Sequence, residues 1–72
     1  METNELNLEL RIEGMRCDGC VKSVTRVLSA VPGVRSVDVS LAEGRASIRY
    51  DASRADVDAL RRAVERAGFQ PK

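Results

Sequence analysis

Two cysteines three residues apart are the side chains of this sequence best suited to chemistry. Cys17 and Cys20 lie in the segment Gly14–Cys20, and the chain contains no histidine. A disulfide between them would add little stability, because the loop-closure contribution shrinks with loop length. Side chains at i and i+3 of a helical turn have Cβ atoms about 5–6 Å apart, so both sulfurs can face one ion. The spacing therefore predicts a metal site with Cys17 and Cys20 as its ligands.

The type of ligand favours a soft ion at this site. Thiolates select Cu(I), and by the same chemistry Ag(I) or Hg(II), over Mg²⁺ or Ca²⁺. With bonds of about 2.3 Å, a linear ion needs its sulfurs about 4.6 Å apart, which small rotamer changes can provide. The N–H groups and positive dipole end of a helix N-terminus favour the thiolate form. We expect Cu(I), with other soft metal ions left open.

The same pair is a poor structural zinc site. No histidine completes a tetrahedral ligand set, so two positions would fall to water, carboxylate or another molecule. A site with two protein ligands on an exposed loop can accept a third thiolate from a partner. The metal could then pass through a shared three-coordinate intermediate, without release into water.

Hydrophobic periodicity gives the elements that must position the cysteines. Apolar and polar residues alternate from Leu6 to Glu13, which predicts a half-buried strand. From Cys17 the apolar spacing becomes 3, 4, 3, which predicts a helix that ends near Pro32-Gly33. Its apolar stripe contains Val21, Val24, Leu28 and Val31. The cysteines are thus expected between the first strand and the first helix.

The second half of the chain repeats this design. Two alternating runs, Val37–Leu41 and Ala46–Tyr50, flank Gly44 and predict an antiparallel hairpin. Ser53 followed by Asp56 resembles the capping arrangement of a helix that Gly68 ends. The helix stripe contains Val57, Leu60, Val64 and Ala67. The last four residues leave room for a short edge strand, so we predict an α+β ferredoxin-like βαββαβ sandwich with two helices on one face of an antiparallel sheet.

Length and composition exclude several classes of protein. Seventy-two residues suit a single domain over 1–72, too small for a deep substrate cavity. The net charge is +1, and Tyr50 and Phe69 are the only aromatic residues, so nucleic acid binding is disfavoured. No apolar run approaches the roughly 20 residues of a membrane span. We expect a cytoplasmic location without membrane insertion.

Several short segments together resemble the heavy-metal-associated domain family, over nearly the whole chain. They are Gly-Met-x-Cys-x-x-Cys at 14–20, Val-Pro-Gly-Val at 31–34, Tyr-Asp at 50–51 and Ala-Gly-Phe at 67–69. Free-standing members of similar length act as copper chaperones that deliver Cu(I) to similar N-terminal domains of copper-transporting P-type ATPases. Relatives handle Hg(II), Zn(II) or Cd(II).

The resemblance also assigns expected roles to individual residues. It implies that Cys17 and Cys20 bind the metal, that Met15 packs beneath the metal loop, and that Phe69 lies beside the site. Arg16 departs from the family pattern, which commonly has a small, often hydroxyl-bearing residue before the first cysteine. This departure leaves the identity of the metal less certain.

Three alternatives to a free-standing Cu(I) carrier follow from the same residues. Cys-x-x-Cys at a helix start is also the arrangement of thiol–disulfide oxidoreductases, although such folds are longer. The chain could serve as a carrier or sensor domain for Hg(II), Zn(II) or Cd(II), or be a fragment of a larger transporter. Two molecules could also bridge Cu(I) in a homodimer. We expect no enzymatic activity.

Overall fold

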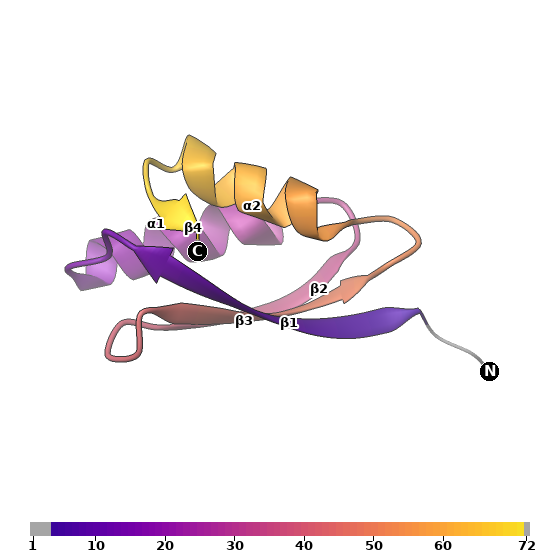
Figure 1. Ribbon diagram of the computed structural model, residues 1–72, viewed down its shortest axis with the longest axis horizontal. Helices are drawn as coiled ribbons and strands as arrows, with labels where there is room; N and C mark the ends of the chain where they lie inside the picture. Colours follow the sequence, from indigo (N-terminus) through magenta and orange to yellow (C-terminus); the bar gives the residue numbers. More distant parts are fainter. Residues whose placement is uncertain (1–3, 72) are drawn as a thin grey trace.

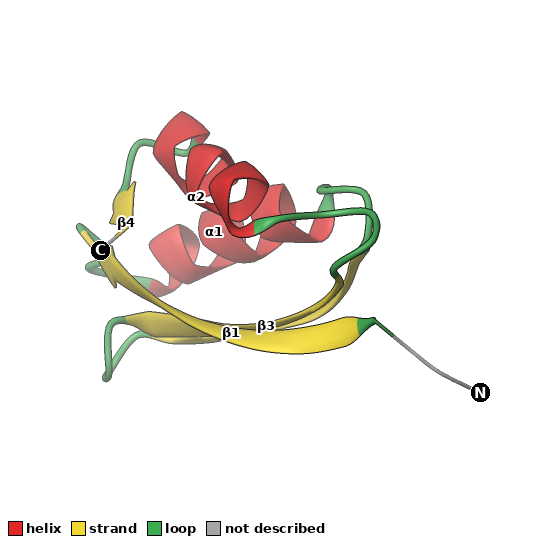
Figure 2. Ribbon diagram, turned by 45° about the vertical axis from the view of Figure 1, so that its right-hand side comes forward, coloured by secondary structure: helices red, strands yellow, loops and turns green. Residues whose placement is uncertain are grey.

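The computed structural model describes residues 4–71. Along the chain lie β1 (Glu5–Glu13), α1 (Asp18–Ser29), β2 (Val34–Ser40), β3 (Arg45–Asp51), α2 (Val57–Arg66) and β4 (Gln70–Pro71). The strands form one antiparallel sheet in the order β2-β3-β1-β4. Both helices cover the same face of this sheet (Figures 1 and 2). The predicted ferredoxin-like βαββαβ sandwich is confirmed.

The core lies between the sheet and the helices. Its largest fully buried side chains come from both layers: Leu28, Ile48, Leu60, Val24 and Val64. Each contributes about 1.5–3 kcal/mol by leaving water. The 3, 4, 3 spacing placed Val24, Leu28, Leu60 and Val64 on the buried faces of α1 and α2, as predicted. Burial of these two stripes fixes both helices against the sheet.

The inward face of β1 is buried only toward its C-terminal end. Leu10 and Ile12 are each 3% exposed, whereas Leu6 is 51% exposed, against the expectation of a uniformly half-buried strand. The helices lie over the end of β1 that leads into the metal loop, and the start of the strand extends beyond them (Figure 1). The buried C-terminal half of β1 therefore leads into the candidate site, whereas the helices do not cover the N-terminal half.

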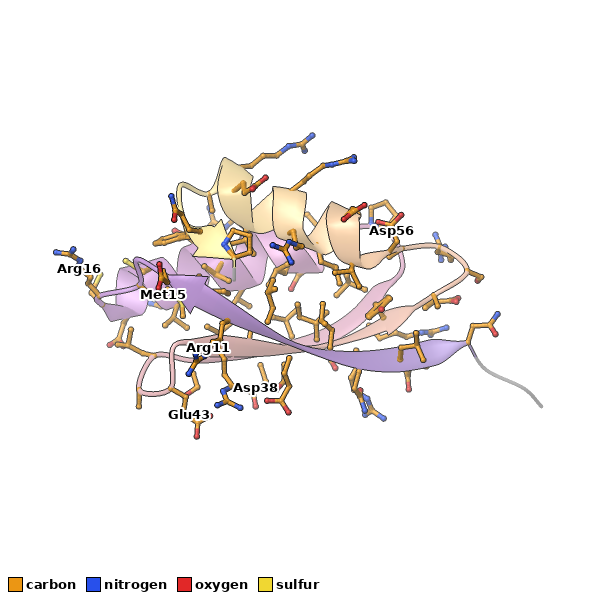
Figure 3. The ribbon with its side chains drawn as sticks, viewed as in Figure 1. Arg11, Met15, Arg16, Asp38, Glu43 and Asp56 are labelled. Carbon is orange, nitrogen blue, oxygen red and sulfur yellow. The ribbon has the colours of Figure 1, made fainter. Side chains whose placement is uncertain are left out.

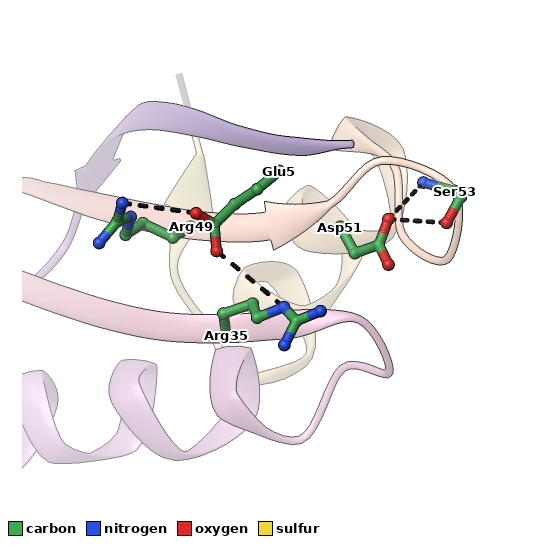
Figure 4. A network of polar contacts seen from close by, with 5 residues as sticks. All are labelled: Glu5, Arg35, Arg49, Asp51 and Ser53. Atoms are coloured by element: carbon green, nitrogen blue, oxygen red, sulfur yellow. Dashed lines mark hydrogen bonds and ion pairs between the residues drawn. The ribbon is translucent and has the colours of Figure 1, made fainter. Parts of the chain in front are cut away.

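The cap of α2 differs from the prediction. Asp56, not Ser53, is the N-cap residue, and its Oδ1 accepts a hydrogen bond from the backbone N–H of Ala59 at 2.8 Å. Ser53 instead donates twice to Asp51 Oδ1, from its backbone N–H at 2.9 Å and from its hydroxyl at 2.7 Å (Figure 4). These bonds hold the pKa of the Asp51 carboxyl below its usual value, the hydroxyl contributing most.

The last strand is as short as predicted. Among residues 4–71, β4 pairs with β1 at two positions, Ile12 with Pro71 and Glu13 with Gln70. This pairing places the C-terminal end of the described chain beside the strand that enters the metal loop (Figure 1). Among residues 4–71, none of the helices has the length and apolar character needed to cross a membrane.

Candidate metal centre

The candidate metal loop, residues 14–17, joins the end of β1 to the first turn of α1. Gly14 follows β1 with φ +104°, a conformation that residues with a Cβ rarely adopt, and it turns the chain out of the sheet. Cys17 is the N-cap of α1, with extended backbone angles of φ −155° and ψ 171°. Its carbonyl accepts hydrogen bonds from the backbone N–H groups of Cys20 at 3.0 Å and Val21 at 3.3 Å. The helix start thereby fixes the two cysteines relative to one another.

The sulfurs of Cys17 and Cys20 lie 3.5 Å apart, and both cysteines are free thiols. With metal–sulfur bonds of about 2.3 Å, this separation corresponds to an S–metal–S angle of about 100°. A trigonal ion needs about 4.0 Å and a linear ion about 4.6 Å. The pair must therefore open by about 0.5 Å for three-coordinate binding and by about 1.1 Å for two-coordinate binding. Side-chain rotation can provide either movement.

Hydrogen bonds to its sulfur favour the thiolate of Cys20. The largest effect comes from the backbone N–H of Arg16, followed by the Cys17 side chain and the Cys17 backbone, and together they lower the pKa of the Cys20 thiol. The sequence pointed to the amides of the helix N-terminus as the source of this effect. The amide with the largest effect instead belongs to Arg16, in the loop before the helix. A sequence motif specifies side chains, so it could not predict this backbone contact.

The remaining loop residues divide between the core and solvent. Met15 is half-buried and packs against the hydrophobic core, in agreement with its expected packing role. Phe69 also packs on the core, and a Cβ built on Gly14 would lie 3.3 Å from its ring, so Phe69 lies at the base of the loop. Arg16 is exposed and points away from the helices (Figure 3). A Cβ on Gly19 would lie 3.7 Å from the Cys17 sulfur, so glycine leaves that side of the sulfur uncovered.

The described residues bring two cysteine sulfurs together without a third His, Cys, Asp or Glu side chain. Among residues 4–71, no group of three or more His, Cys, Asp or Glu side chains is placed to hold a metal ion. The Asp18 carboxylate, an oxygen donor suited to harder ions, lies exposed in the first turn of α1, where its negative charge interacts favourably with the helix dipole. An angle near 100° would also suit a tetrahedral ion, but two of its four ligands would have to come from elsewhere.

Comparison with known proteins assigns the family. The family model for the heavy-metal-associated domain matches residues 9–70, and the chain belongs to this family. It is 47% identical over 62 residues to an uncharacterized protein of Haemophilus influenzae, covering 86% of this chain and 90% of that protein. It is 46% identical over 61 residues to copper-transporting ATPase 1 of Rhizobium meliloti, covering 85% of this chain but 7% of the ATPase. The chain thus corresponds to a small part of such an ATPase.

Solved structures agree with this assignment. The CopZ metallochaperone superposes with a TM-score of 0.91 at 34% identity, covering 93% of this chain and all of that one. A copper-binding domain from the P-type ATPase HMA7 gives a TM-score of 0.90 at 29% identity, covering 92% and 89% of the two chains. Metallochaperones and ATPase domains therefore share this fold, and the chain resembles both.

Proposed function

We propose that this chain carries Cu(I) and transfers it to a homologous domain of a copper-transporting P-type ATPase. Cys17 and Cys20 hold the ion, and transfer proceeds by thiolate exchange. The observation that carries the proposal is a pair of cysteine sulfurs 3.5 Å apart at the start of α1, with no third His, Cys, Asp or Glu side chain placed beside them in the described chain. Cu(I) accepts two or three thiolates, so this site binds the ion and still leaves a position for an incoming ligand.

The transfer steps follow from the coordination number. A sulfur of the acceptor binds the Cu(I) held by Cys17 and Cys20, which gives a three-coordinate ion. One metal–sulfur bond to this chain then breaks, and a second acceptor sulfur replaces it. The remaining metal–sulfur bond to this chain then breaks, which leaves Cu(I) on the two acceptor sulfurs. The oxidation state of copper does not change, and each departing thiolate stays charged or takes a proton from water. The lowered pKa of Cys20 reduces the competition of protons with the metal for this sulfur.

The proposed metal and the proposed acceptor are supported by the related proteins as well as by the chemistry of the sulfur ligands. The relatives include copper-transporting ATPases and a structure named as a metallochaperone. A soft two-sulfur site also accepts Hg(II), and a structure of an oxidized MerP shares this fold at a TM-score of 0.91 and 29% identity. We propose Cu(I) as the physiological cargo, in the cytoplasm, with the other soft ions as competitors.

Transfer kinetics test this proposal. The Cu(I)-loaded chain is mixed anaerobically with the metal-free N-terminal domain of a copper-transporting ATPase, and release to a small chelator is measured separately. We expect the transfer rate to rise with acceptor concentration and to exceed spontaneous release. The control acceptor has both site cysteines replaced by serine and should receive no copper faster than the chelator does. A transfer rate that equals spontaneous release at every acceptor concentration would contradict thiolate exchange.

A further inference from the structure

Gly19 is a glycine that the backbone of this chain does not require. The sequence contains five glycines, and the other four have positive φ, a conformation that strains a residue with a Cβ: Gly14, Gly33, Gly44 and Gly68. Gly19 has no positive φ and lies inside α1, one residue after the helix begins at Asp18. Alanine is the more stable residue at a helical position. The fold therefore gains no stability from glycine at this position.

The space beside Gly19 would admit a side chain. Among residues 4–71, and apart from the adjacent residues and the backbone of its own helix, a Cβ at Gly19 would have one neighbour within 4 Å, the Cys17 sulfur at 3.7 Å. This is an ordinary van der Waals distance, so alanine would fit without moving the loop. Gly19 is also exposed, so a longer side chain could extend into solvent. Neither backbone strain nor packing explains the glycine, which points to a functional reason for it.

The space that Gly19 leaves empty borders the more exposed of the two sulfur ligands. Cys17 is exposed, whereas Cys20 is half-buried. The backbone N–H groups of Arg16 and Cys17 donate hydrogen bonds to the Cys20 sulfur, and they occupy its loop side. An incoming ligand therefore has more room beside the Cys17 sulfur than beside the Cys20 sulfur.

The coordination of Cu(I) sets the distance at which an acceptor sulfur must fit. With metal–sulfur bonds of about 2.3 Å, the third sulfur of a trigonal ion lies about 4.0 Å from the sulfurs of Cys17 and Cys20. A Cβ at position 19 would lie 3.7 Å from the Cys17 sulfur, so a side chain there would fill part of the same shell around this sulfur. The acceptor sulfur also brings its own Cβ and backbone, which need further room beside Cys17.

We propose that Gly19 keeps open the approach by which the acceptor's thiolate reaches Cu(I) beside Cys17. This inference rests on the proposed copper transfer and names the residue that admits the acceptor. In this step a bond forms between Cu(I) and the deprotonated acceptor sulfur, and one bond to Cys17 or Cys20 then breaks, without oxidation or reduction. Gly19 binds neither the metal nor a sulfur and acts through the space that it leaves. Its lower helix stability accompanies faster transfer, as is common at functional positions.

A side chain at position 19 should separate transfer from metal binding. Gly19→Ala and Gly19→Leu keep both sulfur ligands, so their Cu(I) affinity should stay within about threefold of wild type. Transfer to the metal-free N-terminal domain of a copper-transporting ATPase should slow with side-chain size, and Gly19→Leu should be at least about tenfold slower than wild type. Spontaneous release, extrapolated to zero chelator concentration, should be unchanged, because it needs no incoming ligand. Gly19→Ala should also unfold at a higher urea concentration than wild type.

Ser23→Leu is the matched control. Ser23 is exposed and lies four residues after Gly19 in α1, so the two positions share a helix face with Cβ atoms about 5–6 Å apart. The control adds the same side chain one turn farther from the sulfurs, and it should transfer copper at close to the wild-type rate. Equal slowing in Ser23→Leu and Gly19→Leu would indicate a general obstruction of docking and would overturn the role assigned to Gly19.

The measurements distinguish failure of this inference from failure of the proposed function. Acceptor-dependent transfer in wild type, with the same rate in both Gly19 variants, would refute the role of Gly19 and leave copper transfer standing. Slower transfer with an equal loss of Cu(I) affinity would refute it as well, because the glycine would then support the site itself. A wild-type chain that transfers copper no faster than it releases the ion would contradict both proposals.

Discussion

Gly33 joins the end of the first helix to β2, and replacing it with alanine should be the most damaging single-methyl change in the chain. Its φ is +96°, and its carbonyl accepts a hydrogen bond from the backbone N–H of Asp51 at 2.8 Å. A Cβ at Gly33 would lie 2.8 Å from the Cβ of Arg54 and 3.1 Å from both the Cβ and the backbone N of Ala55. Neither contact can be relieved by rotating a side chain, because each Cβ moves only with its backbone, and Ala55 is also buried, at 7% exposed, next to the cap of α2.

The expected cost adds three effects. Positive φ in a residue with a Cβ costs about 1–3 kcal/mol, and the overlap with Arg54 and Ala55 about 1–3 kcal/mol more. Alanine also lowers the conformational entropy of the unfolded chain relative to glycine, which offsets about 0.4–1 kcal/mol of this cost. The net loss is about 1–5.6 kcal/mol, centred near 3 kcal/mol, against a total stability of about 4–11 kcal/mol expected for 72 residues. Gly33→Ala should therefore lower the free energy of unfolding by roughly half.

Gly68 supplies the matched control. Its φ of +93° is nearly that of Gly33, but a Cβ there would meet nothing within 4 Å. Gly68→Ala should therefore cost about 1–2 kcal/mol, from backbone strain alone. Urea unfolding of both metal-free, reduced variants, followed by circular dichroism, measures the difference. Equal stabilities for the two variants, or a Gly33→Ala variant as stable as wild type, would refute the steric account.

Three further changes probe the cap, the acid response and the metal loop. Asp56→Ala should lower the free energy of unfolding by about 1 kcal/mol in urea, whereas Asp56→Asn keeps the acceptor and should stay near wild type. Ser53→Ala should raise the pKa of Asp51 toward 3.8, measured by carboxyl NMR. The stability from this carboxylate is present above pH 3.8 and is lost as the pH falls through the lowered folded pKa. The variant should therefore have less of this stability near neutral pH and lose less on acidification, and an unchanged pKa would contradict the Ser53 contact. Met15→Ala should cost about 1–3 kcal/mol of stability but leave Cu(I) affinity unchanged, and a large loss of affinity would make Met15 a ligand.

Periodicity predicted the packing of the core well. The alternation around Leu10 and Ile12, and the helical spacing of Val24 and Leu28, depend on local geometry that the sequence carries directly. The exposure of Leu6 could not be predicted in this way. It depends on how far the helices extend over the sheet, which is set by packing between distant segments.

The closeness of the two cysteine sulfurs could be predicted from the sequence, whereas the contacts around them could not, and metal binding by the pair stays a prediction. Two cysteines at helical spacing identified the sulfur pair, because side-chain type and spacing carry that information. The hydrogen bond from the Arg16 backbone to the Cys20 sulfur came from the folded loop alone. The role of Ser53 was missed for a similar reason, since both of its donors bind the Asp51 carboxylate and α2 begins only after Asp56.

The central claim is that one Cu(I) binds to the sulfurs of Cys17 and Cys20. Anaerobic titration of the reduced chain against a competing Cu(I) chelator tests it most directly. We predict tight binding of one copper per chain, its loss in Cys17→Ser and in Cys20→Ser with the fold retained by circular dichroism, and wild-type affinity in Asp18→Asn. Wild-type affinity in either cysteine variant would contradict the two-sulfur site.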